Sequence, residues 1–221
     1  MNKPRISIVE FLNTAPLVWG FTDGPLAGRY DLSFTVPSLC AEALRAGQAD
    51  VAIIPAIEYQ RIPGLVALPG MAVAARGEVR SILVVARKPI ELAKRIALDT
   101  SSRSSVALVK LLCRNFWGIS PEFVDAEPDP AAMLASADAA LVIGDPALHL
   151  DPATLPFETL DLGAEWTQMT GLPMIFALWA GRKEVMQPRY EQAFLDSCRY
   201  GLAHLDEIVR EQFPIRGITE Q

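Results

Sequence analysis

The chain has 221 residues, of which 51% are hydrophobic and 21% are charged, and its formal net charge is -6 at pH 7. This composition excludes a disordered or fibrous protein, and the length is enough for one domain or for two lobes of about 100 residues each. Because the chain is acidic and has no run of Lys or Arg, we do not expect nucleic acid as a partner.

The apolar segments point to a cytoplasmic protein, and the cysteines are expected to be small core residues rather than metal ligands. No apolar stretch approaches the roughly 20 residues that cross a bilayer, and Glu10 and Asn13 interrupt the apolar part that a signal peptide requires. The three cysteines are odd in number and far apart, without the close spacing of a zinc site. No nucleotide-binding or metalloprotease motif is present. We therefore expect no membrane contact, no metal and no cofactor.

Along the chain, short apolar runs alternate with helical patterns, which predicts an α/β fold of mostly parallel sheets covered by helices. One helix is predicted over residues 39–46, behind Ser38, and a long final helix from Pro188 to Val209. The expected strands are residues 5–9, 51–54, 81–86, 96–98, 139–143 and 175–180.

Polar, site-like turns occur both early in the chain and in its middle. This distribution favours two lobes with a ligand cleft between them over a single sheet. We expect lobe 1 to comprise residues 1–82 and 178–221, and lobe 2 to comprise residues 83–177.

The first polar turn places Asn13 and Thr14 directly after the first expected strand. Strand ends of open α/β sheets line ligand crevices. Asn13 offers an acceptor and two N–H donors, and Thr14 offers a hydroxyl. An Asx turn before the helix that Pro16 begins explains the same residues equally well.

The second polar turn, residues 99–105, is the most distinctive feature of the sequence, and we call it the serine turn. It carries five hydroxyl groups and Arg103, and leucines at helical spacing follow it, so the turn opens a helix. The first N–H groups of a helix lack internal partners and lie at the positive end of its dipole. A single helix cap would need only one hydroxyl. The turn therefore predicts a cradle for a carboxylate or phosphate.

Acidic residues follow two other strands. Glu58 could act as a base or as the structural partner of an arginine, and we favour the structural role. Gly144 allows close backbone approach, and Asp145 could cap the helix that Pro146 begins or face the cleft as a base. Residues 163–173, around Trp166, suggest a loop at the cleft.

Five segments taken together resemble the chorismate dehydratases, in the order of that family and over residues 7–182. They are Phe11-Leu-Asn-Thr-Ala-Pro-Leu, Ile54-Pro-Ala-Ile-Glu-Tyr-Gln-Arg, Leu98-Asp-Thr-Ser-Ser-Arg-Ser-Ser, Ile143-Gly-Asp-Pro-Ala-Leu and Trp166-Thr-Gln-Met-Thr-Gly-Leu-Pro. The resemblance implies a periplasmic-binding-protein-like fold of type II, with two α/β lobes and a central ligand cleft. Ala56 stands where the family usually has Ser, so we leave this position out of the site.

The resemblance further implies a carbon-oxygen lyase of menaquinone biosynthesis by the futalosine pathway. Its reaction removes water from chorismate to give 3-[(1-carboxyvinyl)oxy]benzoate, without a cofactor. Two alternatives are a non-catalytic cytoplasmic binding protein for a small carboxylate and the sister enzyme that makes 1,4-dihydroxy-6-naphthoate. The sequence is also compatible with a homodimer.

For this reaction we expect Asn13 to be catalytic. The expected substrate-binding residues are Thr14, Ser81, Thr100, Ser101, Ser102, Arg103, Ser104, Ser105, Gly144 and Asp145. The proton could be taken by a protein base, either Asp145 or Glu58. It could also be taken by the enolpyruvyl carboxylate of the substrate while Asn13 orients the leaving hydroxyl. We favour this substrate-assisted route.

Overall fold

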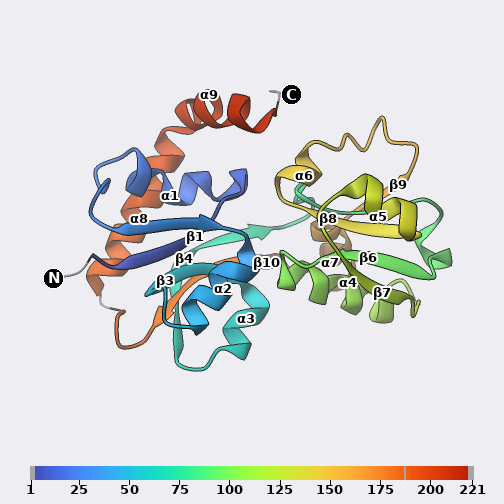
Figure 1. Cartoon of the computed structure of the whole chain (residues 1–221), viewed down its shortest axis with the longest axis horizontal. Coiled ribbons are helices and arrows are strands. Elements are labelled where there is room, and N and C mark those ends of the chain that lie inside the picture. The colour runs from blue at the N-terminus through green and yellow to red at the C-terminus, as the bar shows by residue number, and fades with distance from the viewer. Residues whose placement is uncertain (1–2, 187, 219–221) are drawn as a thin grey trace. The chain divides into compact units, whose positions relative to one another are not determined.

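The structure, a computed structural model, describes residues 3–186 and 188–218, and it confirms the α/β class with two lobes (Figure 1). Unit 1 comprises Met1–Val73 and Ala177–Gln221, and unit 2 comprises Ala74–Phe176. The sequence-based boundary lay at residue 82, but residues 74–82 belong to unit 2. The reason is that Ile82 begins a strand of the second sheet, where it pairs with Ile143.

Unit 1 is built on a five-stranded sheet of order β2-β1-β3-β10-β4. Its strands are β1 (Arg5–Val9), β2 (Asp31–Thr35), β3 (Val51–Pro55), β4 (Leu65–Ala75) and β10 (Met174–Arg182). β1 runs parallel to β2 and β3, and β10 is antiparallel to β3. Every residue of β3 is buried, as expected for a central strand with helices on both faces.

The helices of unit 1 cover both faces of this sheet. They are η1 (Leu12–Thr14), α1 (Ala15–Thr22), α2 (Pro37–Arg45), α3 (Ala56–Arg61), α8 (Pro188–Ala203) and α9 (Leu205–Arg216). In Figure 1, α1 and α8 lie on one face and α2 and α3 on the other. The core includes Phe194, whose ring meets Phe21 and Trp179 edge to face at centroid distances of 4.9 and 4.7 Å. α2 begins at Pro37 rather than after Ser38, because proline suits the first helical position.

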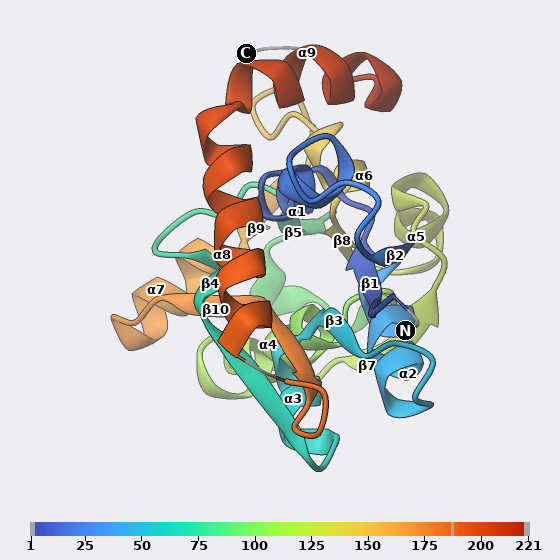
Figure 2. The ribbon, with the colours of Figure 1, turned by 90° about the vertical axis from the view of Figure 1, so that its left-hand side faces the viewer.

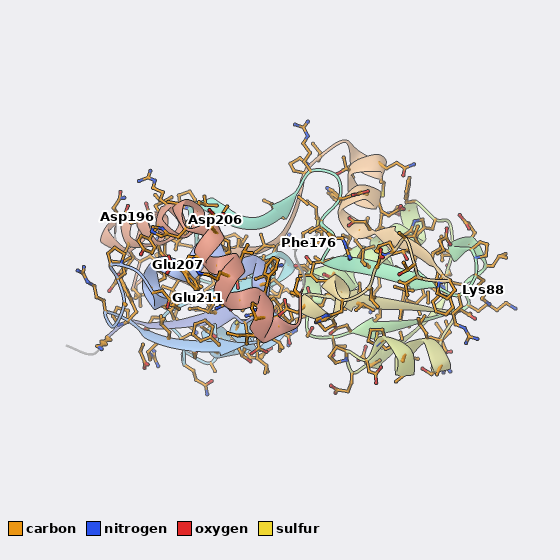
Figure 3. The ribbon with its side chains drawn as sticks, turned by 90° about the horizontal axis from the view of Figure 1, so that it is seen from above. Lys88, Phe176, Asp196, Asp206, Glu207 and Glu211 are labelled. Carbon is orange, nitrogen blue, oxygen red and sulfur yellow. The ribbon has the colours of Figure 1, made fainter. Side chains whose placement is uncertain are left out.

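The C-terminal segment forms two helices instead of the single long helix that we predicted. The break falls at His204, whose backbone leaves the helical region with φ −123° and ψ 32°, and α9 leaves α8 at a steep angle (Figure 2). Asp206 and Glu207 lie in the first turn of α9, where the helix dipole favours negative charge, and Glu211 follows them (Figure 3). The apolar spacing alone could not reveal this break, because it continues across it.

Unit 2 is built on a second five-stranded sheet of order β7-β6-β8-β5-β9. Its strands are β5 (Ile82–Ala86), β6 (Arg95–Asp99), β7 (Glu122–Ala126), β8 (Ala139–Ile143) and β9 (Glu158–Asp161). β6 is parallel to β7 and β8, whereas β5 is antiparallel to β8 and β9. The carboxyl ends of β6 and β8 and the amino end of β5 therefore lie side by side. We call this row of strand ends one edge of the unit 2 sheet.

The helices of unit 2 again cover both faces, with α4 and α7 on one side and α5 on the other (Figure 1). They are η2 (Ile90–Leu92), α4 (Arg103–Asn115), α5 (Pro130–Ser136), α6 (Asp145–Leu148) and α7 (Leu162–Thr170). The predicted loop around Trp166 was wrong, because it forms α7. Asp161 caps this helix by accepting the backbone N–H groups of Gly163 and Ala164 at 2.9 and 3.1 Å, and Gly171 ends it with a φ of 73°.

No helix in the described part of the chain combines the length and the apolar character that crossing a bilayer requires.

Candidate functional site

Most of the predicted substrate-binding residues gather at one edge of the unit 2 sheet. The serine turn follows β6, and Gly144 and Asp145 follow the adjacent parallel strand β8. The backbone N–H of Gly144 donates to the carbonyl of Ser81 at 2.8 Å, which places Ser81 beside them. Gly144 has a φ of 65° and a ψ of −145°, a conformation that only glycine adopts easily, and this lets β8 pass directly into α6. Tertiary structure thus assembles residues that the sequence spreads over three segments.

Within the serine turn, Ser102 and Ser105 interact with each other. Ser102 is the N-cap of α4, and its Oγ accepts the backbone N–H of Ser105 at 3.4 Å and lies 2.9 Å from the hydroxyl of Ser105. Ser104 is buried, Arg103 is half-buried and Thr100 is exposed. Two of the five hydroxyls therefore serve the helix cap, and the turn has more polar groups than the cap uses.

The most deeply buried acidic group of this edge is Asp99, a residue that the sequence reasoning left outside the site. It is 1% exposed. Its Oδ1 accepts the backbone N–H of Ser101 at 2.9 Å, while its Oδ2 has no hydrogen-bond partner among the described residues. Burial raises the pKa of Asp99, and hydrogen bonding by Ser101 and by the backbone of Ile143 only partly opposes this rise. The sequence could have indicated Asp99, because it is an acidic residue at the end of an apolar central strand.

Ser81 is held in place by the residue before it. Asp161 accepts the backbone N–H of Arg80 at 2.6 Å. Arg80 has a φ of 63°, which a non-glycine residue rarely adopts. Its guanidinium donates to the carbonyl of Ala147 at 3.0 Å and to that of Leu150. Arg80 therefore ties the Ser81 backbone to the C-terminal end of α6, the helix that Asp145 opens.

Asp145 is the first residue of α6, and the N-cap position belongs to Gly144. The capping role that the sequence allowed for Asp145 is therefore not the observed one. Its negative charge still lies in the first turn of the helix, where the dipole favours it. Asp145 is half-buried and belongs to the same edge as the serine turn.

Asn13 and Thr14 lie in unit 1, in the short helix between β1 and α1. The hydroxyl of Thr14 is buried and faces the carbonyls of Val9 and Phe11 at 2.5 and 2.8 Å. Its single proton is committed to these carbonyls, so Thr14 can offer a ligand only a lone pair. Asn13 is exposed, and its side-chain amide makes no hydrogen bond with the described residues.

A pocket of about 320 Å³ in unit 1 lies beside this turn. Its lining residues are Val9, Glu10, Phe11, Thr14, Ala15, Val18, Trp19, Thr22, Asp23, Phe34, Gln212 and Arg216. They include two carboxylates and one guanidinium, so the lining has no surplus of positive charge with which to attract a dicarboxylate. Asn13 is not among them.

Glu58 has the structural role that we favoured. Its carboxylate is 1% exposed and forms ion pairs with Arg45 and with Arg61, the latter at 3.0 Å. Charge-assisted hydrogen bonds of this kind hold the carboxylate in a fixed position. These ion pairs favour the structural role of Glu58 over that of a catalytic base.

The architecture defines the class of protein. Two α/β units joined by two crossings of the chain are typical of the periplasmic-binding-protein-like fold. Solved structures of similar fold support this class. Protein AF1704 from Archaeoglobus fulgidus has a TM-score of 0.76 at 21% identity, with 97% of this chain and 81% of that chain covered. The aliphatic sulphonate binding protein SsuA from Escherichia coli has a TM-score of 0.64 at 16% identity, with 99% and 80% covered. At these identities the likeness shows the fold alone.

The sequence defines the family within this class. Residues 4–216 match the family described as menaquinone biosynthesis. The chorismate dehydratase of Thermus thermophilus is 31% identical to this chain, over 83% of this chain and 73% of the relative. The chain therefore belongs to the menaquinone biosynthesis family.

Proposed function

We propose that this protein is a chorismate dehydratase, a cytoplasmic hydro-lyase of the futalosine pathway that converts chorismate into 3-[(1-carboxyvinyl)oxy]benzoate. The observation that carries the proposal is the relationship to the Thermus thermophilus enzyme. The assembly of Ser81, the serine turn and Gly144 at one sheet edge supports it, because chorismate needs a site for a carboxylate.

In this proposal the serine turn binds the ring carboxylate of chorismate, with Ser81 beside it. The C3 hydrogen of chorismate is vinylogous to that carboxylate. As the C3–H bond breaks, negative charge develops toward the carboxylate oxygens. Hydrogen-bond donors placed there stabilise the transition state more than the ground state, which is the requirement for catalysis.

The proton goes to the enolpyruvyl carboxylate of the substrate itself. The C3–H electron pair forms the new ring double bond, the C4–O bond breaks, and the departing hydroxide and the proton together make the water that is lost. Asn13 donates to the leaving oxygen. Positioning of this kind reaches effective molarities of about 10⁵ M or more, so no protein base is needed. The engagement of Glu58 by two arginines supports this route.

The test is to incubate the purified protein with chorismate and follow the product by mass spectrometry. We expect an aromatic product lighter than chorismate by one water. Binding of chorismate without turnover would favour the non-catalytic binding protein. Formation of 1,4-dihydroxy-6-naphthoate from the substrate of the sister enzyme, with no turnover of chorismate, would favour that enzyme.

Two variants test the substrate-assisted route. Asn13→Ala should lower kcat about 100-fold or more, because it removes a donor to the leaving oxygen. Asp145→Asn should retain most of kcat, because Asp145 is not the base. The opposite ranking of the two kcat values would overturn this route.

A further inference from the structure

The serine turn contains an unexplained buried group. Asp99 is 1% exposed and ends β6, a strand with neighbours on both sides, β7 and β8. Its Oδ1 has one hydrogen bond, from the backbone N–H of Ser101, and its Oδ2 has none among the described residues. The hydroxyl oxygen of Ser101 is buried in the same turn and is also without a partner. A buried carboxylate ion normally has donors on both oxygens or a cation, whereas Asp99 has its donors from Ser101 and the backbone of Ile143 and no cation from the described part of the chain.

The charged residues on the neighbouring elements do not supply the missing partner. The charged residues near this edge include Arg103 on α4, Glu127 after β7, Asp145 on α6 and Arg80 beside Ser81, and the guanidinium of Arg80 donates to the carbonyls of Ala147 and Leu150. Within the described structure, the Oδ2 atom of Asp99 has no hydrogen-bond partner from any of these elements. The negative charge of Glu127 acts together with burial to raise the pKa of Asp99. Both influences favour the neutral acid over the ion.

We propose that Asp99 is a positioning residue that stays a neutral carboxylic acid, and that its neutrality allows the adjacent serine turn to accept a carboxylate of the substrate. The identity of that carboxylate rests on the proposed function. Through Oδ1, Asp99 fixes the backbone of Ser101 and hence the geometry of the turn. Its proton removes a negative charge that would repel a second carboxylate a short distance away.

This assignment makes substrate affinity depend on pH in one direction. Above the pKa of Asp99 the ionised form repels the ligand, so KM for chorismate should rise by up to tenfold per pH unit while kcat changes little. A merely structural aspartate would leave KM flat until the protein unfolds. The loss of affinity at high pH is therefore the signature that separates the two roles.

A matched pair of variants tests the proposal. In Asp99→Asn, the amide oxygen still accepts the N–H of Ser101 and the side chain is always neutral. We expect its KM at pH 7 to lie within about threefold of wild type and to lose its rise at high pH. Asp99→Ala removes the acceptor, so KM should increase about tenfold or more. A tenfold increase in Asp99→Asn, with the wild-type pH profile retained, would overturn the proposal.

Infrared spectroscopy of the protein without substrate tests the protonation state separately. The difference spectrum of wild type minus Asp99→Asn at pH 7 should contain the carbonyl band of a protonated carboxylic acid, and absence of this band would refute a neutral Asp99. If chorismate is not turned over, the proposed function fails but this spectrum still decides the protonation state. Calorimetric titration with benzoate then replaces KM as the measure of affinity, with the same expected pH dependence.

Discussion

Two carboxylates, Glu58 in unit 1 and Asp99 in unit 2, are each only 1% exposed, yet their surroundings are opposite. Glu58 meets the guanidinium groups of two arginines, whereas Asp99 has hydrogen bonding from Ser101 and the backbone of Ile143 and no cation among the described residues. Burial penalises the ionised form in both places, and only the arginines compensate for it. Burial alone therefore does not decide the protonation state of a carboxyl group. The hydrogen-bond and charge partners decide whether the group is an ionised structural carboxylate or a neutral acid.

The largest expected change in the free energy of unfolding concerns Glu58, the carboxylate that is paired with arginines. Glu58→Gln should lower the free energy of unfolding by about 2 kcal/mol, because it removes two charge-assisted hydrogen bonds. Arg45 and Arg61 are 39% and 54% exposed, so water can solvate them and limit the loss. Urea unfolding measures the change, with the exposed Gln60→Ala on the same helix as control. A loss below about 0.5 kcal/mol would show that these ion pairs contribute little.

A third carboxylate, Asp161, extends the comparison to an acid that is satisfied by backbone N–H groups alone. It accepts N–H groups from Val79, Arg80, Gly163 and Ala164. Asp161→Ala should lower the free energy of unfolding by about 1–2 kcal/mol, because the α7 cap and the anchor of the preceding segment are both lost. Asp161→Asn should recover at least half of this loss. If both variants were equally unstable, charge rather than hydrogen bonding would be the cause.

A smaller effect is expected for the cap beside Asp99. Ser102→Ala should lower the free energy of unfolding by about 1 kcal/mol, the usual value for an N-cap. Thermal unfolding measures it, and Ser136→Ala, at an exposed position near the end of α5, is the control. A loss well above 2 kcal/mol would mean that the serine turn contributes to stability beyond its role as a cap.

In acid the smallest effect is that of Asp99 itself, and this effect grows as pH rises. The pKa of Asp99 is raised in the folded protein, so its contribution to stability is complete below the pKa of the unfolded chain and is lost as pH rises through the folded pKa. Asp99→Asn should therefore match wild type within about 0.5 kcal/mol in acid. It should gain relative stability as pH increases. Urea unfolding at a series of pH values measures this trend, and a difference that is independent of pH would contradict it.

The predictable part of the fold was its centre. β3, β5 and β8 are buried along their whole length, and their continuous apolar runs were recognised as strands. β2, β4, β7 and β9 escaped prediction, because each lies at the edge of its sheet and is partly exposed, so its sequence is mixed. Edge strands bury too little surface to impose an apolar pattern.

The arrangement of the candidate site residues was predictable where it depends on local order along the chain. The serine turn and Gly144 follow strands, and the topology brings these strand ends together as expected. The partners of Glu58 and the isolation of Asp99 depend on tertiary packing. Arg45 meets Glu58 across 13 residues of sequence, and the unpartnered oxygen of Asp99 results from its place within the sheet. Neither follows from residue spacing.

The interruption of unit 1 by unit 2 has a consequence for biosynthesis on the ribosome. Unit 2 is one continuous segment, Ala74–Phe176, so it can fold as soon as that segment has emerged. The sheet of unit 1 must wait, because β10 lies between β3 and β4 and is made last of its strands. During that interval β3 and β4 lack their shared neighbour and expose edges that pair readily with other chains. The half of the protein that is translated first is thus the half that finishes folding last.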